Sequence, residues 1–433
     1  MSGQRAKIGL ALAGGGPLGL IYEIGALVAL QEAVEGADFT QCHATVGVSA
    51  GAFIAASLAN GLTPRDLCTR FIESRDRAEP FEPDFLMRPA FAEYARRVVG
   101  LPDLALDAVA AFFDRSTSTG ARRGLFEALQ GFARALPNGV FDNDAAAAYL
   151  AKMFDRSGRT NDFRQLRHRL FIVATDLDTA EAVVFGSPGL DNVPISEAIK
   201  ASSALPGLYP PASIGGRDYV DGALKKTLHA SVALRAGAQL LFCINPLVPF
   251  DARLASGEAK GAHRRLSDAG LTTVLSQTFR ALIQSRMKVG MDRYAHEFPD
   301  ADIVLFEPAR DDAQIFFANV FSYADRRRLA EHAYRHTRAE LRRRVPELAP
   351  ILARHGLRLD LSALADPDRR LLAEPAQPAR GLAAETRRLT AALGRLEHAL
   401  AQGAPVRTHG SVAASGRMSD GAKAKKKDAR AHS

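Results

Sequence analysis

The chain has 433 residues, of which 47% are hydrophobic and 24% are charged, a balance typical of a globular protein with a sizeable core. Its 3 cysteines are far apart and form no CxxC pair, which argues against a disulfide framework and a zinc site. The net charge is +8, but residues 376–433 carry eleven Lys or Arg and four Asp or Glu, so the preceding 375 residues carry only +1. We therefore expect no nucleic-acid-binding groove on the main part of the chain.

The first sixty residues show the same local pattern twice. Residues 7–14 and 44–49 are short apolar runs that predict buried strands, and each is followed by glycines or a small-residue turn. Residues 18–34 and 50–61 have apolar side chains at helical spacing. This repeated order of strand, turn and helix predicts a parallel sheet covered by helices.

The alternation resumes after residue 168. Strands are expected at 170–177, 181–187, 217–224, 239–246 and 301–308, and helices at 195–205, 230–238, 271–297 and 322–344. The last of these helices is strongly basic. We interpret residues 1–346 as one domain.

Four other segments have different patterns. Residues 73–140 are helical but broken by prolines, and we interpret them as an insertion that forms a lid over the sheet, or as extra helices beside the domain. Residues 347–381 are expected to be a helix and linker. Leucines at heptad spacing in 382–402 predict an amphipathic, coiled-coil-like helix that could self-associate. Residues 403–433 are predicted to be a disordered basic tail, which would bind anionic membranes or only keep the chain soluble.

The apolar stretch after Lys7 is shorter than a signal peptide requires, and no apolar run is long enough for a membrane-spanning helix. The few, scattered cysteines fit a reducing compartment. We therefore expect a cytoplasmic protein, or one attached peripherally at the cytosolic face of a membrane.

A glycine-rich loop, A-G-G-G-P-L-G at 13–19, joins the first strand to the first helix. It contains G-x-G-x-x-G at Gly14, Gly16 and Gly19, which in this context is compatible with a dinucleotide site. Alternatively, its backbone amides could stabilise a negatively charged oxygen in a transition state. The loop alone does not distinguish the two.

A second loop favours the catalytic alternative. G-V-S-A-G fits the G-x-S-x-G pattern, in which a serine on a sharp strand-to-helix turn needs small neighbours, here Gly47 and Gly51 around Ser49. The ends of neighbouring parallel strands lie about 5 Å apart. Amides of the first loop would therefore face a carbonyl held at Ser49 and form an oxyanion hole. Since Pro17 has no N–H, the donors must come from Gly14, Gly15 and Gly16.

The proton of Ser49 needs an acceptor, and two candidates stand out. Asp221 ends the strand-like run Y-V-D-G-A, and Gly222 lets the chain turn away so that the carboxylate can project. A carboxylate that is held close and partly desolvated has the proton affinity of a general base. His229, which opens the next helix, is the second candidate. The other later histidines are interpreted as solvated helix surface.

Four blocks in this order resemble the patatin-like phospholipases. They are the glycine loop 13–19, G-V-S-A-G at 47–51, A-S-S-A-L-P-G-L-Y-P-P at 201–211 and D-G-A at 221–223. The hairpin-like run 171–185 is also similar to that family's central hairpin. The resemblance covers residues 5–250, with weaker continuation to 345. Many members carry Arg or Lys where this chain has Leu18, so phospholipid and neutral-lipid substrates both stay open.

The resemblance implies a serine lipid acyl hydrolase of the phospholipase A or lysophospholipase type. It implies a Ser–Asp dyad formed by Ser49 and Asp221, and a three-layer α/β/α sandwich with a mostly parallel sheet. No cofactor and no metal are expected, and the expected partner is a lipid ester. Two alternatives remain: an acyltransferase with the same dyad, and a non-catalytic scaffold protein on a lipid surface.

Overall fold

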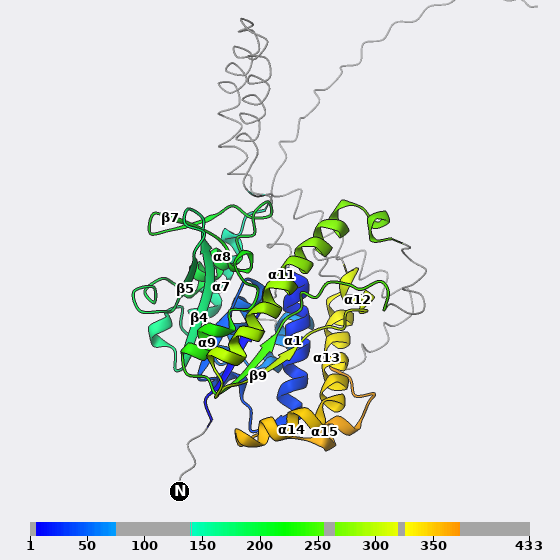
Figure 1. The fold of residues 1–433 in the computed structure, drawn as a ribbon. Coiled ribbons are helices and arrows are strands. Elements are labelled where there is room, and N and C mark those ends of the chain that lie inside the picture. Colours follow the sequence, from blue (N-terminus) through cyan, green and yellow to red (C-terminus); the bar gives the residue numbers. More distant parts are fainter. Residues whose placement is uncertain (1–5, 75–138, 140, 255–264, 319–324, 373–433) are drawn as a thin grey trace, which may run out of the picture. The chain divides into compact units, whose positions relative to one another are not determined.

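The computed structural model describes residues 6–74, 139, 141–254, 265–318 and 325–372 (Figure 1). The strands are β1 Ile8–Leu12, β2 Val34–Glu35, β3 Ala44–Gly47, β4 Arg169–Asp176, β5 Ala182–Phe185, β6 Ala212–Ile214, β7 Arg217–Asp221, β8 Leu240–Ile244, β9 Asp302–Phe306 and β10 Arg358–Leu359. The helices are α1 Gly16–Ala33, α2 Ala50–Ala59, α3 Pro64–Leu67, α7 Asp144–Phe154, α8 Ile195–Ser202, α9 Ala230–Arg235, α11 Leu271–Glu297, α12 Ala313–Phe316, α13 Arg326–Arg343, α14 Val345–Arg354 and α15 Leu361–Ala365.

The central sheet has eight strands, seven of them in the order β6-β7-β4-β3-β1-β8-β9, with β5 paired to β4. β4, β3, β1, β8 and β9 are parallel, whereas β5, β6 and β7 run antiparallel to their neighbours. In register, Leu12 lies opposite both Gly47 of β3 and Ile244 of β8. The chain therefore leaves β1, β3 and β8 at the same edge of the sheet.

Alternating side chains of the strands pack into two hydrophobic cores, one on each face of the sheet. Leu10 and Leu12 of β1 belong to the larger core, together with side chains of α1, α2, α8 and α13. Ala11, between them, belongs to the smaller core, which contains side chains of α9 and Tyr294 of α11. Because successive strand residues point to opposite faces, helices on both sides complete the three-layer α/β/α sandwich that the sequence predicted (Figure 1).

Helix α1 is buried on nearly all sides, which explains why its sequence is apolar all round. It lies between the sheet and α13, and the two helices contact each other along much of their length (Figure 1). A Cβ at Gly25 would lie 2.5 Å from the Ala330 carbonyl oxygen, so only glycine permits α13 to approach this closely.

The structure confirms the predicted strands and helices of residues 7–61 and 170–344 to within a few residues. The helix predicted at 271–297 is α11, with the same bounds. The helix α7 and the short elements α3, β2, β6, α12, β10 and α15 were not predicted. Most of the proposed insertion 73–140, the linker after residue 372, the coiled-coil-like helix 382–402 and the tail 403–433 lie outside the described residues.

The first compact unit extends to Leu372, beyond the expected domain end at residue 346. Residues of the expected helix and linker form α14, β10 and α15, and β10 pairs with β2. The side chain of Arg338 on α13 is 1% exposed and donates to the carbonyl oxygens of Ala363 and Asp366 at 2.7 and 2.8 Å. Backbone acceptors in the 361–366 segment thus bind Nη2 of a buried guanidinium, which ties that segment to the domain, whereas Nη1 of Arg338 has no partner among the described residues.

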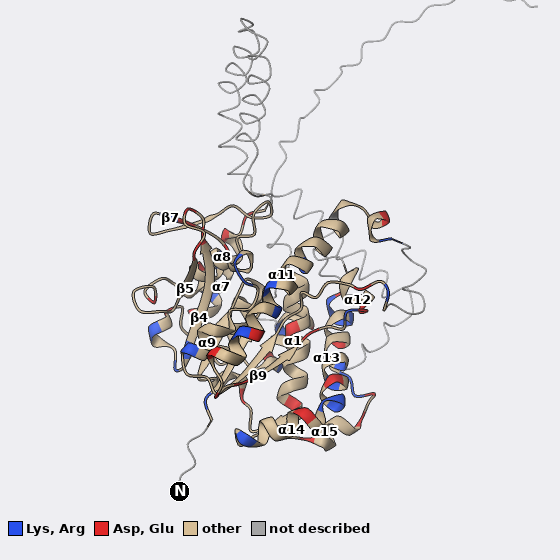
Figure 2. Ribbon diagram, in the orientation of Figure 1, with Lys and Arg blue, Asp and Glu red and all other residues tan. Residues whose placement is uncertain are grey.

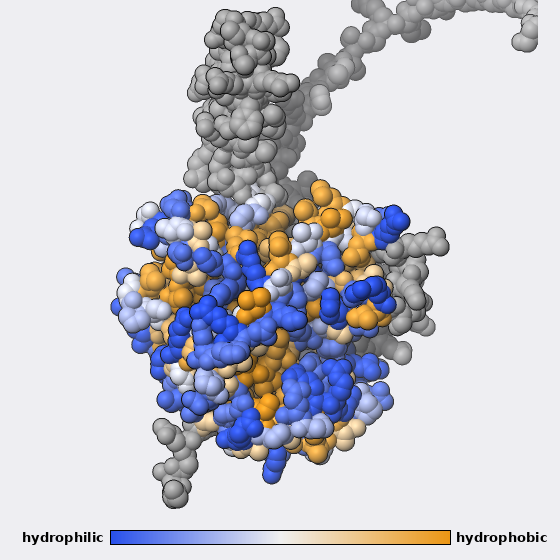
Figure 3. Space-filling model, in the orientation of Figure 1, coloured by the Kyte–Doolittle hydropathy of each residue, from blue (hydrophilic) through white to orange (hydrophobic). Residues whose placement is uncertain are grey.

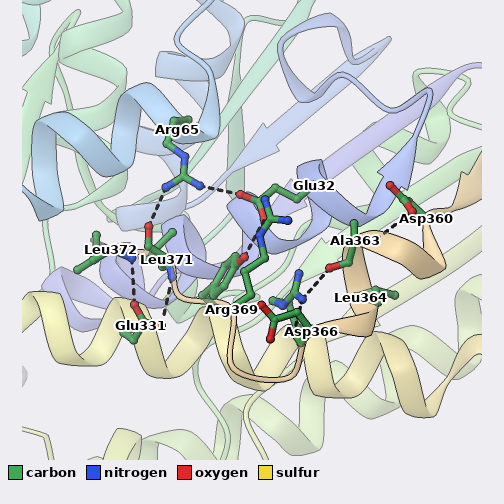
Figure 4. A network of polar contacts seen from close by, with 12 residues as sticks. Glu32, Arg65, Glu331, Asp360, Ala363, Leu364, Asp366, Arg369, Leu371 and Leu372 are labelled. Atoms are coloured by element: carbon green, nitrogen blue, oxygen red, sulfur yellow. Dashed lines mark hydrogen bonds and ion pairs between the residues drawn. The ribbon is translucent and has the colours of Figure 1, made fainter. Parts of the chain in front are cut away.

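A further polar network holds the end of this unit (Figure 4). Arg65 donates to Glu32 at 2.6 Å and to the carbonyl oxygen of Leu371 at 2.9 Å. Glu331 of α13 accepts hydrogen bonds from the backbone amides of Leu371 and Leu372. Side chains from α1, α3 and α13 therefore form one network that holds Leu371 and Leu372, the last two residues that the structure describes.

The three cysteines, Cys42, Cys68 and Cys243, are all buried and unpaired, as small core hydrophobes. Burial raises the pKa of Cys42 and of Cys68 to about 12 and raises that of Cys243 as well. In the described part of the chain, no helix combines the length and apolar character that crossing a membrane requires.

Candidate active site

Ser49 lies at the junction of β3 and α2 in a backbone conformation that few residues adopt. Its φ is 53°, in the left-handed region that side chains with a Cβ usually avoid. A Cβ at Gly47 would lie 2.4 Å from the Cα of Ala52, and one at Gly51 would lie 2.6 Å from the Leu12 carbonyl oxygen. The two glycines of G-x-S-x-G are therefore required because α2 crosses so close to β3 and β1.

Ser202, at the end of α8, holds the Ser49 backbone in place. Its Oγ accepts a hydrogen bond from the Ser49 N–H at 2.8 Å and donates one to the Val173 carbonyl oxygen at 2.6 Å. Both interactions are buried. Such local strain persists only where surrounding contacts enforce it. Ser202 lies in the 201–211 block, but its contact with Ser49 was not predictable from the sequence, because the two residues are 153 positions apart and no local pattern reveals the contact.

Asp221 ends β7, where it pairs with Ala174 of β4. Its side chain is 3% exposed, accepts a hydrogen bond from the Ala223 amide at 2.8 Å and is hydrogen-bonded by the side chain of Ser49. Burial raises the pKa of Asp221 from 3.8 to about 6, and the two hydrogen bonds act in the opposite direction. The structure thus brings together the hydroxyl and the carboxylate that the sequence had paired across 172 positions.

Gly222 permits the turn that follows Asp221. A Cβ at this position would lie 2.2 Å from the Val173 carbonyl oxygen, so any side chain would push the 221–223 segment away from β4. The carboxylate of Asp221 could then not stay beside Ser49. The Asp-Gly pair is therefore explained by close packing against the neighbouring strand.

The glycine loop lies beside the same hydroxyl. A Cβ at Gly14 would be 3.3 Å from the Cβ atoms of both Ser49 and Ala223. Gly15 and Gly19 are packed against each other, and a Cβ at Gly15 would lie 2.8 Å from Cγ of Pro246. Gly16 has a φ of 59°, which suits glycine.

Within the described residues, the amides of Gly14, Gly15 and Gly16 donate no hydrogen bond to a protein acceptor. They lie at the start of α1, where the first N–H groups of a helix are unpaired and the helix dipole is positive. This is the environment that an oxyanion hole needs. Leu18 is 3% exposed and belongs to the core, which explains an apolar residue there in this chain.

His229, the second candidate base, lies near Asp221 but has a different partner. Its ring is 4% exposed, and Nε2 is hydrogen-bonded to the Gly222 carbonyl oxygen at 3.4 Å. Burial lowers its pKa to about 4. Of the two candidates, it is Asp221 whose side chain is hydrogen-bonded to Ser49. Among the residues that the structure covers, no group of three or more His, Cys, Asp or Glu has an arrangement suited to a metal ion.

A serine on a strand-to-helix turn, bonded to a buried carboxylate and flanked by helix-start amides, is typical of serine acyl hydrolases on an α/β sandwich. Comparison with protein families gives the specific assignment. A family model described as patatin-like phospholipase matches residues 10–234, which are 225 of the 433 residues. The chain therefore belongs to the patatin-like phospholipase family, and membership supports lipid hydrolase activity.

Several solved structures are similar to this chain at low identity. VipD from Legionella pneumophila is 13% identical, with a TM-score of 0.33, over 78% of this chain and 67% of that chain. The type III effector ExoU is 17% identical, with a TM-score of 0.31, over 93% and 66%. The ExoU–SpcU complex of Pseudomonas aeruginosa gives 17% identity and a TM-score of 0.27, over 82% and 64%. The chain thus spans about two thirds of these proteins.

Proposed function

We propose that the chain is a serine lipid acyl hydrolase of the phospholipase A or lysophospholipase type, with Ser49 as nucleophile and Asp221 as general base. The observation that carries the proposal is that Ser49, on the strained turn after β3, lies beside the buried Asp221 carboxylate and lowers its pKa as a side-chain partner. A base with a pKa of about 6 is unprotonated at neutral pH and still has a useful proton affinity. The substrate we propose is a lipid ester.

The reaction follows from the positions of these groups. The Ser49 oxygen attacks the acyl carbonyl carbon while its proton passes to Asp221. The amides of Gly14, Gly15 and Gly16 stabilise the resulting oxyanion, each donor contributing about 3 kcal/mol at the transition state. The carbon–oxygen bond to the alcohol then breaks, and Asp221 returns the proton to that alcohol.

Deacylation repeats these steps with water. Asp221 accepts a proton from a water molecule as its oxygen attacks the acyl-enzyme, and the same amides stabilise the second oxyanion. Collapse of this intermediate releases the fatty acid and returns the proton to Ser49. No further base is needed, because Asp221 alternates between proton acceptor and donor.

The test is covalent labelling by a fluorophosphonate, followed by turnover of a short-chain ester. We expect wild-type protein to be labelled and Ser49→Ala to lose labelling, while Asp221→Asn stays folded and loses turnover by a factor of at least roughly 100. Asp218→Asn is the matched control, because Asp218 is an exposed carboxylate on the same strand. Turnover in Asp221→Asn at the level of Asp218→Asn would show that another group is the base, and labelling of Ser49→Ala would exclude Ser49 as the nucleophile.

A further inference from the structure

Helix α11 carries an exposed stripe of large apolar side chains. Of the eight large hydrophobic residues that are exposed in the described parts of the chain, five lie on this helix. They are Leu271, Val274, Leu275, Leu282 and Val289, with exposed fractions of 39–73%. At helical spacing these positions fall within an arc of roughly 100°. The stripe, defined by these five residues, therefore lies on one face of the helix, on which the exposed Thr278 and Ser285 also lie.

The opposite face of α11 is already occupied by the protein. Arg280, Ile283 and Tyr294 are buried, and Gln277 exchanges two hydrogen bonds with the backbone of Phe250 at 3.0 and 2.8 Å. The helix therefore cannot rotate to bury the stripe without breaking these contacts. In Figure 3, orange side chains gather along the upper part of α11.

Within the first part of the helix, residues 271–291, the charges have one sign, and the acids Asp268, Asp292 and Glu297 lie beyond the two ends of that part. No Asp or Glu occurs between Leu271 and Met291, whereas Arg286 and Lys288 are exposed there. Lys226, also exposed, lies on the segment that α11 packs against. Figure 2 shows the long acid-free part of α11. An apolar stripe flanked by cations is the pattern of helices that lie in the interface of an anionic membrane.

A cavity of about 300 Å³ opens between α11 and the 223–228 segment. Its wall is mostly apolar and includes Ala223, Leu228, Leu282 and Met291, and Lys226 and Arg286 also line it. Leu282 belongs to both the stripe and the cavity. Ala223 follows Asp221 by two residues and packs near Gly14 and Ser49. Ala223 therefore belongs to the wall of the cavity and lies next to the candidate active site, while Leu282 belongs to the wall and to the stripe.

We propose that the stripe of α11 is the surface with which the protein docks on an anionic phospholipid bilayer, so that an acyl chain leaving the bilayer enters the cavity beside Ala223. This inference rests on the proposed lipid acyl hydrolase function, because that function explains why the protein would need to bind a bilayer. A second copy of this chain fits less well, because a two-fold contact along the stripe would bring together the cations of two 271–291 segments, neither of which contains an Asp or Glu.

The test places a polarity-sensitive fluorophore on Leu282→Cys in the Ser49→Ala background, so that lipids are not consumed. The native cysteines are buried, which makes the new thiol the reactive one. Vesicles of phosphatidylglycerol and phosphatidylcholine should shift the emission to shorter wavelength. Leu361→Cys is the matched control, because Leu361 is 58% exposed against 57% for Leu282 and lies on α15, which packs on α1 across the sheet.

The charge component is tested with Lys288→Gln, for which the vesicle partition coefficient should fall roughly fivefold. Lys152→Gln, a change of an exposed lysine on α7, should leave it unchanged. The proposal is overturned by a missing shift at position 282, which would mean that another part of the chain or a second copy covers the stripe. An equal shift at position 361, or on pure phosphatidylcholine, would also overturn it. These readouts do not require catalysis, so they are independent of whether Ser49 is the nucleophile.

Discussion

In the proposed pair of Asp221 and Ser49, activity depends on the protonation state of Asp221. Burial raises the pKa of Asp221 from 3.8 to about 6 because a desolvated carboxylate favours its neutral form. The carboxylate must be unprotonated to accept the serine proton, so activity is present above this pKa and is lost as the pH falls through it. We expect kcat/KM for a water-soluble ester to rise tenfold per pH unit below about pH 6 and then to level off.

The measurement is a pH profile of kcat/KM on the folded protein, with folding checked at each pH. An inflection near pH 4 would contradict the prediction, since it would mean that Asp221 is solvated in the free enzyme. The same inflection would also be expected if His229 were the base, because burial lowers the pKa of His229 to about 4, so the turnover of Asp221→Asn separates these two cases.

Among single residues, the sequence predicted those whose role requires a particular residue type within a short motif. Ser49, Asp221 and the glycines belong to short motifs. Each of these glycines is required because the backbone there packs closely against a nearby residue or against the neighbouring strand. Ser202 had no such signal. Its hydroxyl connects the Ser49 amide to the Val173 carbonyl, and a serine with that role has the same local sequence as one that packs at a helix end.

Among the helices, α2 and α11 each contain a glycine in a different environment. A Cβ at Gly51 would lie 2.6 Å from the carbonyl oxygens of both Leu12 and Ala13, whereas one at Gly290 would have no neighbour nearer than 3.8 Å. We expect Gly51→Ala to lower the free energy of unfolding by at least about 2 kcal/mol, because α2 must move away from β1. Gly290→Ala should raise it by about 0.5–1 kcal/mol through helix propensity.

Urea unfolding of the two variants measures both free-energy changes. The pair is matched in chemistry, since each adds one methyl group to a helix. Equal effects of the two substitutions would contradict the packing argument, because helix propensity alone predicts stabilisation in both.

Elements within the strand–helix alternation were predictable, even the four-residue strands β3 and β5, whereas α7 and the shortest elements were not. The helix at 271–297 has a long helical pattern without proline, and the structure forms it with the predicted bounds. β2 and β10 have two residues each, and their antiparallel pairing joins Val34 to Leu359. A two-residue strand has no period to recognise, so only the tertiary contact defines it.

For the whole molecule, the end of the compact unit at Leu372 has a measurable consequence. Truncation after residue 372 should leave the melting temperature close to that of the full chain. Truncation after residue 346 removes α14, β10 and α15, together with both backbone acceptors of the buried Arg338 guanidinium. Breaking a buried charge contact of this kind costs about 3–5 kcal/mol, so we expect a large loss of stability.

Thermal unfolding followed by circular dichroism compares the two truncations with the full chain. Arg338→Met in the shorter form is an informative addition, since removing the unpaired cation should restore part of the stability. If both truncations melt together, the polar network around Arg65 and Glu331 contributes little. The sequence did not predict this domain end, because the acceptors that hold Arg338 are main-chain carbonyls that no residue type encodes.

Finally, the position of the three thiols deep in the core bears on how the protein tolerates oxidants. Burial raises the pKa of Cys42 and of Cys68 to about 12 and also raises the pKa of Cys243. Hardly any thiolate therefore exists to react with peroxide or maleimide. Inactivation by a serine-directed reagent can then be attributed to a hydroxyl without first blocking sulfur. The folded protein should also keep its monomeric mass on prolonged exposure to air, since no sulfur is placed to join two chains.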